Sequence, residues 1–133
     1  MRLLLDTNIF LEVLLDQDRA AEARQLLSET DGHELFISDF SLPSIGLVLF
    51  RHKQHEAFRR FLVDVVRNAR VDVVTLLPGE MEAVINAARQ FGLDFDDAYQ
   101  HAIADNWALT IISFDADFDR TPAGRRTPGE LHH

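Results

Sequence analysis

Short apolar runs alternate along this chain with stretches of helical periodicity, and this alternation constrains the fold more than any other feature. Four runs are typical of buried strands: residues 2–6, 35–37, 71–77 and 109–112. The segments between them carry apolar residues three or four positions apart, as amphipathic helices do, and one such helix is expected over residues 55–66. Strands that alternate with helices predict βαβ units, so we expect an α/β fold with helices flanking a central parallel sheet.

The length and composition indicate an ordinary globular protein. A chain of 133 residues is expected to form one domain, spanning 1–133, with 47% apolar and 26% charged residues. No apolar run approaches the ~18 residues needed to cross a bilayer, and no secretory signal pattern opens the chain. The absence of cysteine excludes disulfides, thiolate metal sites and a cysteine nucleophile. A cytoplasmic protein without membrane contact is the expectation.

The C-terminal segment 121–133 carries two prolines and two glycines, and we expect it to be mostly irregular. The final His132 and His133 could be a purification-tag remnant, so no site argument includes them.

The formal net charge of −9 argues against a general nucleic-acid binder, which would be basic. The basic residues are nevertheless concentrated in one helical region that contains few acids. This region is interpreted either as a solvated helix face or as a surface that contacts the RNA backbone or a protein partner. Its candidate contact residues are Arg51, Lys53, Arg59 and Arg60.

Acids follow the last apolar run at close spacing. Asp115, Asp117 and Asp119 lie within five residues, directly after Ser113. Their carboxylates repel one another unless water, hydrogen bonds or a cation offset the charge. Asp119 is expected to be a helix cap or an ion-pair partner of Arg120 or Arg125 rather than a metal ligand.

Two other acids occupy equivalent positions earlier in the chain. Asp6 ends the first apolar run. Asp97, with Asp96 beside it, lies at the start of a helix after Gly92, and the expected N-cap of this helix is Asp94 or Asp96. Each alone could be a helix cap. Because the carboxyl ends of parallel strands meet at one edge of a sheet, the set of Asp6, Asp97 and Asp115 predicts a site for a hard divalent cation, Mg²⁺ or Mn²⁺.

The ordered motifs LLLDTNIFL, LDFDDAYQHAIA and TIISFDADF resemble the successive acidic motifs of the PIN-domain nucleases, and within that group the VapC-like toxins of bacterial toxin–antitoxin modules. The resemblance covers nearly the whole chain. It implies a three-layer Rossmann-like fold and a Mg²⁺- or Mn²⁺-dependent endoribonuclease that uses metal-activated water. It also implies a homodimer and inhibition by a small cognate antitoxin.

The resemblance assigns roles by position. Asp6, Asp97 and Asp115 match the first, third and fourth family acids, with Asp117 as an additional acid and possible metal ligand. Thr7 and Asn8 match the polar pair beside the first acid, and Ser113 matches the hydroxyl position.

The second family acid is absent. A glutamate usually stands about six residues after the serine that corresponds to Ser38, and Ser44 occupies that place here. Three alternatives stay open. Ser44 could hold a water, Asp96 or Asp117 could compensate for the missing carboxylate, or the domain could be a catalytically weakened module that binds protein or RNA.

Other acid-dependent or hydrolytic classes fit poorly. A phosphoacceptor receiver needs a lysine near a late strand, and the only lysine is Lys53. The histidines form no HExxH-type zinc motif, and no GxSxG nucleophile elbow is present. Candidate surfaces for a dimer or antitoxin are apolar residues of the first half, most of which we expect in the core: Phe10, Val13, Leu14, Phe40 and Leu49.

Overall fold

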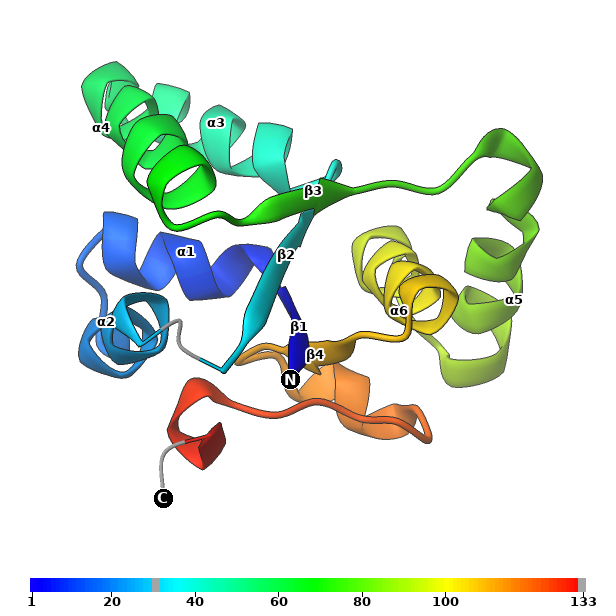
Figure 1. The fold of residues 1–133 in the computed structure, drawn as a ribbon. Coiled ribbons are helices and arrows are strands. Elements are labelled where there is room, and N and C mark those ends of the chain that lie inside the picture. Colours follow the sequence, from blue (N-terminus) through cyan, green and yellow to red (C-terminus); the bar gives the residue numbers. More distant parts are fainter. Residues whose placement is uncertain (30–31, 132–133) are drawn as a thin grey trace.

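The computed structural model describes residues 1–29 and 32–131, so His132 and His133 lie outside the described residues. Its centre is a four-stranded, all-parallel sheet in the order β3-β2-β1-β4 (Figure 1). The strands are β1 Arg2–Leu5, β2 Glu34–Ser38, β3 Asp72–Val74 and β4 Thr110–Ile112. The predicted α/β class with a parallel sheet is therefore confirmed.

Helices cover both faces of the sheet and produce three layers (Figure 1). They are α1 Thr7–Leu14, α2 Ala20–Ser28, α3 Ser41–Arg51, α4 His55–Phe61, α5 Glu82–Phe91 and α6 Phe95–Trp107. Successive strand side chains point to opposite faces. In β1, Leu4 packs in the core under α5 and α6, whereas Leu3 and Leu5 pack in the core under α1 to α4.

Two predicted elements differ from the structure. The strand expected over 71–77 is shorter, because residue 75 leaves the sheet and its carbonyl accepts a hydrogen bond from Trp107 Nε1 at 3.1 Å. The helix expected over 55–66 is α-helical only to Phe61 and continues as a π-helical segment, Leu62–Asn68. The wider turns leave Val65 and Val66 partly buried against the core.

Helix boundaries follow from local chemistry. α5 ends at Gly92, whose φ of 65° lies in the left-handed region that glycine adopts without strain. The N-cap of α6 is Asp94, one of the two expected caps. Asp97 therefore lies in the first turn of α6, as expected, and Asp96 precedes it there.

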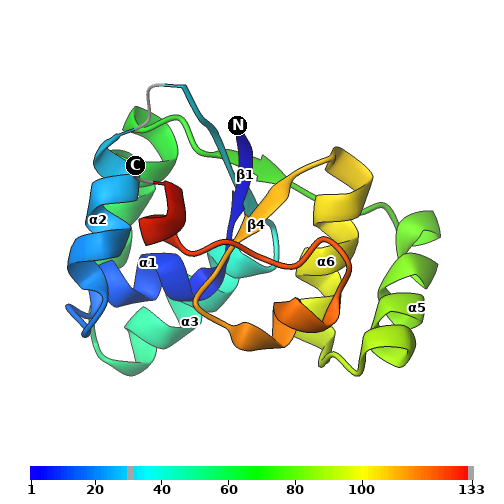
Figure 2. The same cartoon turned by 90° about the horizontal axis from the view of Figure 1, so that it is seen from below.

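The C-terminal segment covers the outer edge of β4 (Figure 2). Arg126 forms an isolated parallel bridge with Ile112, and the amide of Gly129 donates to Glu22 of α2 at 2.7 Å. Apart from this bridge and two short 3₁₀ turns, Ala116–Arg120 and Pro128–Leu131, the segment after β4 is irregular. None of the described helices is long and apolar enough to cross a membrane.

The strand order places a topological switch at β1. The chain passes from β1 to β2 and β3 on one side, and returns to β4 on the other side. In open α/β sheets, ligands bind at the carboxyl ends of the strands at such a point. Asp6 follows β1 directly, and Ser113 follows β4 directly.

Candidate active site

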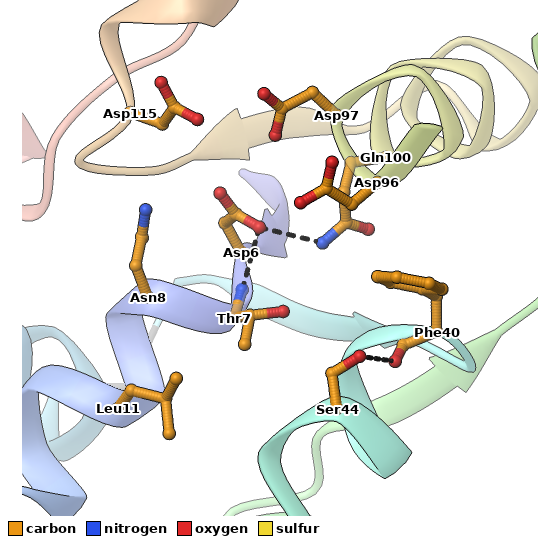
Figure 3. A pocket seen from close by; sticks show the side chains of 10 residues that line it. All are labelled: Asp6, Thr7, Asn8, Leu11, Phe40, Ser44, Asp96, Asp97, Gln100 and Asp115. Carbon is orange, nitrogen blue, oxygen red and sulfur yellow. Dashed lines mark hydrogen bonds between the residues drawn. The ribbon is translucent and has the colours of Figure 1, made fainter. Parts of the chain in front are cut away.

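A cavity of about 310 Å³ opens at the carboxyl edge of the sheet (Figure 3). It is bordered by residues of α1, α3 and α6 and by the loop after β4. Its lining residues are Asp6, Thr7, Asn8, Leu11, Phe40, Ser44, Asp96, Asp97, Gln100 and Asp115. The three acids that the sequence analysis grouped therefore lie at one cavity.

Asp6 is the most firmly held of these acids. It is buried and is the N-cap of α1, where its Oδ1 accepts the Thr7 amide at 2.8 Å. The same oxygen accepts a hydrogen bond from Gln100 Nε2 at 3.0 Å, and Oδ2 accepts one from Ser113 Oγ at 2.7 Å. Three donors from three elements fix the orientation of this carboxylate.

Ser113 connects β1, α1 and the loop after β4. Its hydroxyl donates to Asp6, accepts the Asp115 amide at 2.9 Å and accepts Asn8 Nδ2 at 3.2 Å. Asn8 Oδ1 in turn accepts the Phe114 amide at 3.2 Å. The serine and the asparagine predicted as supporting residues thus hold the acid-bearing loop against Asp6.

Asp97, Asp115 and Asp117 form the tightest acidic group. One carboxylate oxygen of each lies within 4.8 Å of the others. Asp115 caps the 3₁₀ turn that follows it, accepting the Asp117 amide at 2.9 Å. Asp117 also pairs with Arg120 at 3.2 Å, which offsets part of its charge. Asp6 borders this group across the cavity, although its oxygens are already hydrogen-bonded.

Burial and neighbouring acids raise the proton affinity of Asp97 and Asp6. The pKa of Asp97 is raised to about 8, first by burial and then by the negative charges of Asp115, Asp96 and Asp6. Burial also raises the pKa of Asp6, against the hydrogen bonds from Ser113, Gln100 and Thr7 that favour its ionised form. Clustered carboxylates whose charges are not offset are the environment that a cation would stabilise.

The donor set fits a hard divalent cation. Carboxylate oxygens of Asp97, Asp115 and Asp117 supply the oxygen ligands that Mg²⁺ and Mn²⁺ prefer, and open space beside them leaves room for water and a phosphate. Asp97 retains a proton near neutral pH without a cation, and a bound cation would displace it.

Ser44 lies on the cavity but contributes no acid. Its hydroxyl donates to the carbonyl of Phe40, one helical turn earlier in α3, at 2.7 Å (Figure 3). Asp39 is the only acid between residues 35 and 54, and unlike Ser44 it does not line the cavity. Tyr99 and Thr75 donate to its two oxygens at 2.7 and 2.6 Å. Neither residue therefore supplies the missing second carboxylate, whereas Asp96 is exposed and lines the cavity.

Gln100 is a site residue that the sequence analysis missed. Its amide nitrogen donates to Asp6 and, at 2.7 Å, to Ser41 Oγ. Among the described residues, its Oε1 is the one buried side-chain polar atom without a hydrogen-bond partner. The sequence did contain one indication of its role: Gln100 lies three residues after Asp97, and this spacing puts both side chains on one face of a helix.

The structure separates the predicted cationic residues from the acids. Arg51, Lys53, Arg59 and Arg60 are exposed on α3, α4 and the turn between them, and none lines the cavity. Asp119 pairs with Arg125 at 3.3 Å, as one of the two expected ion pairs, and likewise lies outside the lining.

Comparisons with known proteins bear on the family and the fold of the chain. A family model described as PIN domain matches residues 3–124. No curated protein matches the chain. A toxin–antitoxin complex from Klebsiella pneumoniae is similar in structure, with 24% identity, a TM-score of 0.71, and coverage of 94% of this chain and 96% of that chain.

Two further solved structures share the fold at lower identity. Mycobacterium tuberculosis VapC20, described as a Sarcin-Ricin loop cleaving toxin, has 18% identity and a TM-score of 0.74, with 88% of this chain and 92% of that chain covered. VapBC2 from Rickettsia felis, bound to a DNA fragment from its promoter, has 18% identity and a TM-score of 0.71, with 95% and 97% covered.

Proposed function

Because this chain belongs to the PIN domain family, we propose that it is a nuclease that cleaves RNA with the help of a divalent cation. The observation that carries the proposal is the convergence of Asp6, Asp97 and Asp115 at one cavity, with Asp117 beside Asp97 and Asp115. Mycobacterium tuberculosis VapC20, which has the same fold and is described as a Sarcin-Ricin loop cleaving toxin, supports RNA as the substrate.

The acids and the polar residues beside them would have different roles at the cation site. Asp97, Asp115 and Asp117 would hold Mg²⁺ or Mn²⁺, and Asp6 would face the cation from a fixed orientation. When bound, such a cation activates water and offsets negative charge on a phosphodiester. Asn8 and Ser113 hold the loop that carries Asp115 next to Asp6 through hydrogen bonds. A bound cation would favour the ionised form of Asp97, whose proton would pass to solvent.

Cleavage of single-stranded RNA by the purified protein tests this proposal. We expect cleavage in Mn²⁺ or Mg²⁺, loss of cleavage in excess chelator, and recovery when the cation is added back. Unchanged cleavage in chelator would contradict the dependence on a cation.

A second candidate function is a catalytically weakened PIN-like module that binds protein or RNA. The observation that favours it is Ser44, whose hydroxyl is bonded within its own helix at the place of the second family acid. Calorimetric titration with Mn²⁺ separates the two candidates. Cation binding together with cleavage supports the enzyme. The absence of both cation binding and cleavage would support the binding module.

We also propose an antitoxin partner, as in the solved toxin–antitoxin complexes that share the fold. The surface that best suits it is an apolar groove of about 530 Å³ on α3 and α4. Exposed basic side chains on α3, α4 and the turn between them favour a partner helix whose apolar face is bordered by acidic residues. The groove is lined by Leu42, Pro43, Gly46, Leu47, Phe50, Phe58 and Leu62.

None of the apolar interface candidates named from the sequence lines this groove. Phe10 and Leu49 are buried in the core, as expected for most of those candidates, whereas Leu47 and Phe50 of the groove are exposed. Co-purification with the product of an adjacent antitoxin-sized gene tests the partner. Leu47→Asp should abolish the complex while leaving RNA cleavage intact, and an unaffected complex would exclude the groove.

A further inference from the structure

The walls of the cavity differ in chemistry. Figure 3 shows Asp6, Asp97 and Asp115 on one side, and Phe40, Ser44 and Leu11 on the other. The second side is where a fourth carboxylate would have stood, and here it presents an aromatic ring and an aliphatic chain. A ligand that bridges both walls must combine a group suited to a cation with a flat or apolar group.

Phe40 belongs to a group of three aromatic rings that extends from the cavity to the surface. The ring centroids of Phe40, Phe95 and Tyr99 are 5.9 Å apart in each pair. Tyr99 is buried, and its hydroxyl is tied to Asp39 at 2.7 Å, so it gives the other two rings a fixed support. Phe95 is 55% exposed and precedes Asp96 and Asp97 at the start of α6.

A single exposed phenylalanine is ordinary in a soluble protein. Phe95 differs because its ring continues a supported aromatic surface that reaches the cavity lining at Phe40. A second observation concerns the same wall. The amide nitrogen of Gln100 faces Asp6, and its unpaired oxygen points away from Asp6 on the side of Phe40 (Figure 3). A ligand with an N–H group would supply the donor that this acceptor lacks.

We propose that Phe40 and Phe95 form a stacking shelf for one unpaired base of the RNA substrate, beside the phosphodiester held at the acids. This inference rests on the proposed nuclease function and adds the residues that would hold a base next to the cleaved phosphodiester. Unstacked bases are recognised in RNA chiefly by stacking on aromatic side chains. The cavity of about 310 Å³ suits one nucleotide and is too small for a duplex.

Fluorescence of 2-aminopurine tests the shelf directly, because stacking on an aromatic ring quenches it. The probe is a short single-stranded RNA in which 2-aminopurine alternates with uridine, titrated with the protein in Ca²⁺, with the RNA verified as intact afterwards. We expect quenching by the wild type. Phe95→Leu, which keeps an apolar side chain but removes the ring, should lose the quenching and weaken binding at least about fivefold.

Two variants control this measurement. Phe95→Trp retains an aromatic ring and should preserve quenching and affinity. Phe50→Ala removes a phenylalanine of similar exposure, 51%, from the groove on α3 and α4, and should change neither. Absence of quenching by the wild type, or equal quenching and affinity for wild type and Phe95→Leu, would overturn the shelf.

Cleavage of unmodified RNA in Mn²⁺, measured in parallel, keeps the two proposals distinguishable. A wild type that quenches in the Phe95-dependent manner but does not cleave refutes the nuclease and retains the shelf. A wild type that cleaves, together with a Phe95→Leu variant of unchanged quenching and affinity, refutes the shelf alone.

Discussion

At the residue scale, Asp97 carries an electrostatic cost. Its carboxyl lies in the first turn of α6, buried and facing other acids, and its pKa is raised to about 8. An aspartate in an unfolded chain has a pKa of about 3.9. Between these two values the folded chain keeps a proton that the unfolded chain loses, so the free energy of unfolding falls as the pH rises through this window.

We therefore expect unfolding in chelator to show a pH dependence that Asp97→Asn removes. The wild type should lose up to about 1.4 kcal/mol per pH unit from this group between pH 5 and 8. The asparagine variant should be more stable than the wild type at pH 8, by urea unfolding. Asp119→Asn, outside the cavity, is the control. Parallel pH profiles for the wild type and Asp97→Asn would contradict the shift.

Ser44 gives a second prediction at this scale. Ser44→Glu places a carboxylate at the cavity, where the second family acid usually stands, and should tighten Mn²⁺ binding several-fold, because affinity rises with the charge of the ligand set. Ser44→Gln has the same length without the charge and should not tighten it. Calorimetric titration compares the three proteins. Equal affinity for the glutamate and glutamine variants would show that this position does not reach the cation.

At the scale of elements, the pairing of α3 with α4 depends on a glycine. A methyl group added at Gly46 would lie 2.9 Å from the Phe58 ring, which is itself packed against Phe50 and Phe61. A glycine inside a helix costs ~1 kcal/mol relative to alanine, so the sequence predicts a close approach of helices at Gly46. The contact with Phe58 of α4 confirms this prediction.

Gly46→Ala should therefore destabilise the protein, by about 1 kcal/mol or more, although alanine is the better helix former. Gly79→Ala is the matched control, since no atom lies within 4 Å of its added methyl group. Thermal unfolding of both variants measures the difference. A Gly46→Ala variant as stable as Gly79→Ala would mean that the Phe58 ring moves aside at no cost.

Elements and site were predictable from the sequence to different degrees. The strand pattern located all four strands, and the rule that parallel strands share a carboxyl edge brought Asp6, Asp97 and Asp115 together. The π-helical segment Leu62–Asn68 was not predictable, because its apolar spacing fits an α-helix equally well. Gln100 was missed because a neutral amide on a buried helix face has no distinctive pattern before its partners are known.

At the scale of the whole molecule, a cation that binds only the folded chain adds to its stability. At 100 times the dissociation constant the gain is about 2.7 kcal/mol. We expect Mn²⁺ to raise the melting temperature of the wild type by several degrees, as measured by calorimetry. Asp97→Asn should show little of this rise despite its higher starting stability in chelator. An equal rise in both proteins would place cation binding elsewhere.

Homodimerisation and a single folded unit over 1–133 stay predictions at this scale. Sedimentation of the purified protein, alone and with its antitoxin, tests the first, and one cooperative unfolding transition would support the second.

The central claim is that the acids at the carboxyl edge of the sheet cleave RNA. The most direct measurement is the rate of single-stranded RNA cleavage in Mn²⁺ by Asp115→Asn and Asp119→Asn, two equal substitutions four residues apart. Of these two residues, only Asp115 lines the cavity. We expect Asp115→Asn to lose at least about a hundredfold in rate, the scale of removing one element of a catalytic site, and Asp119→Asn to match the wild type. Equal rates for the wild type and both variants would contradict the claim.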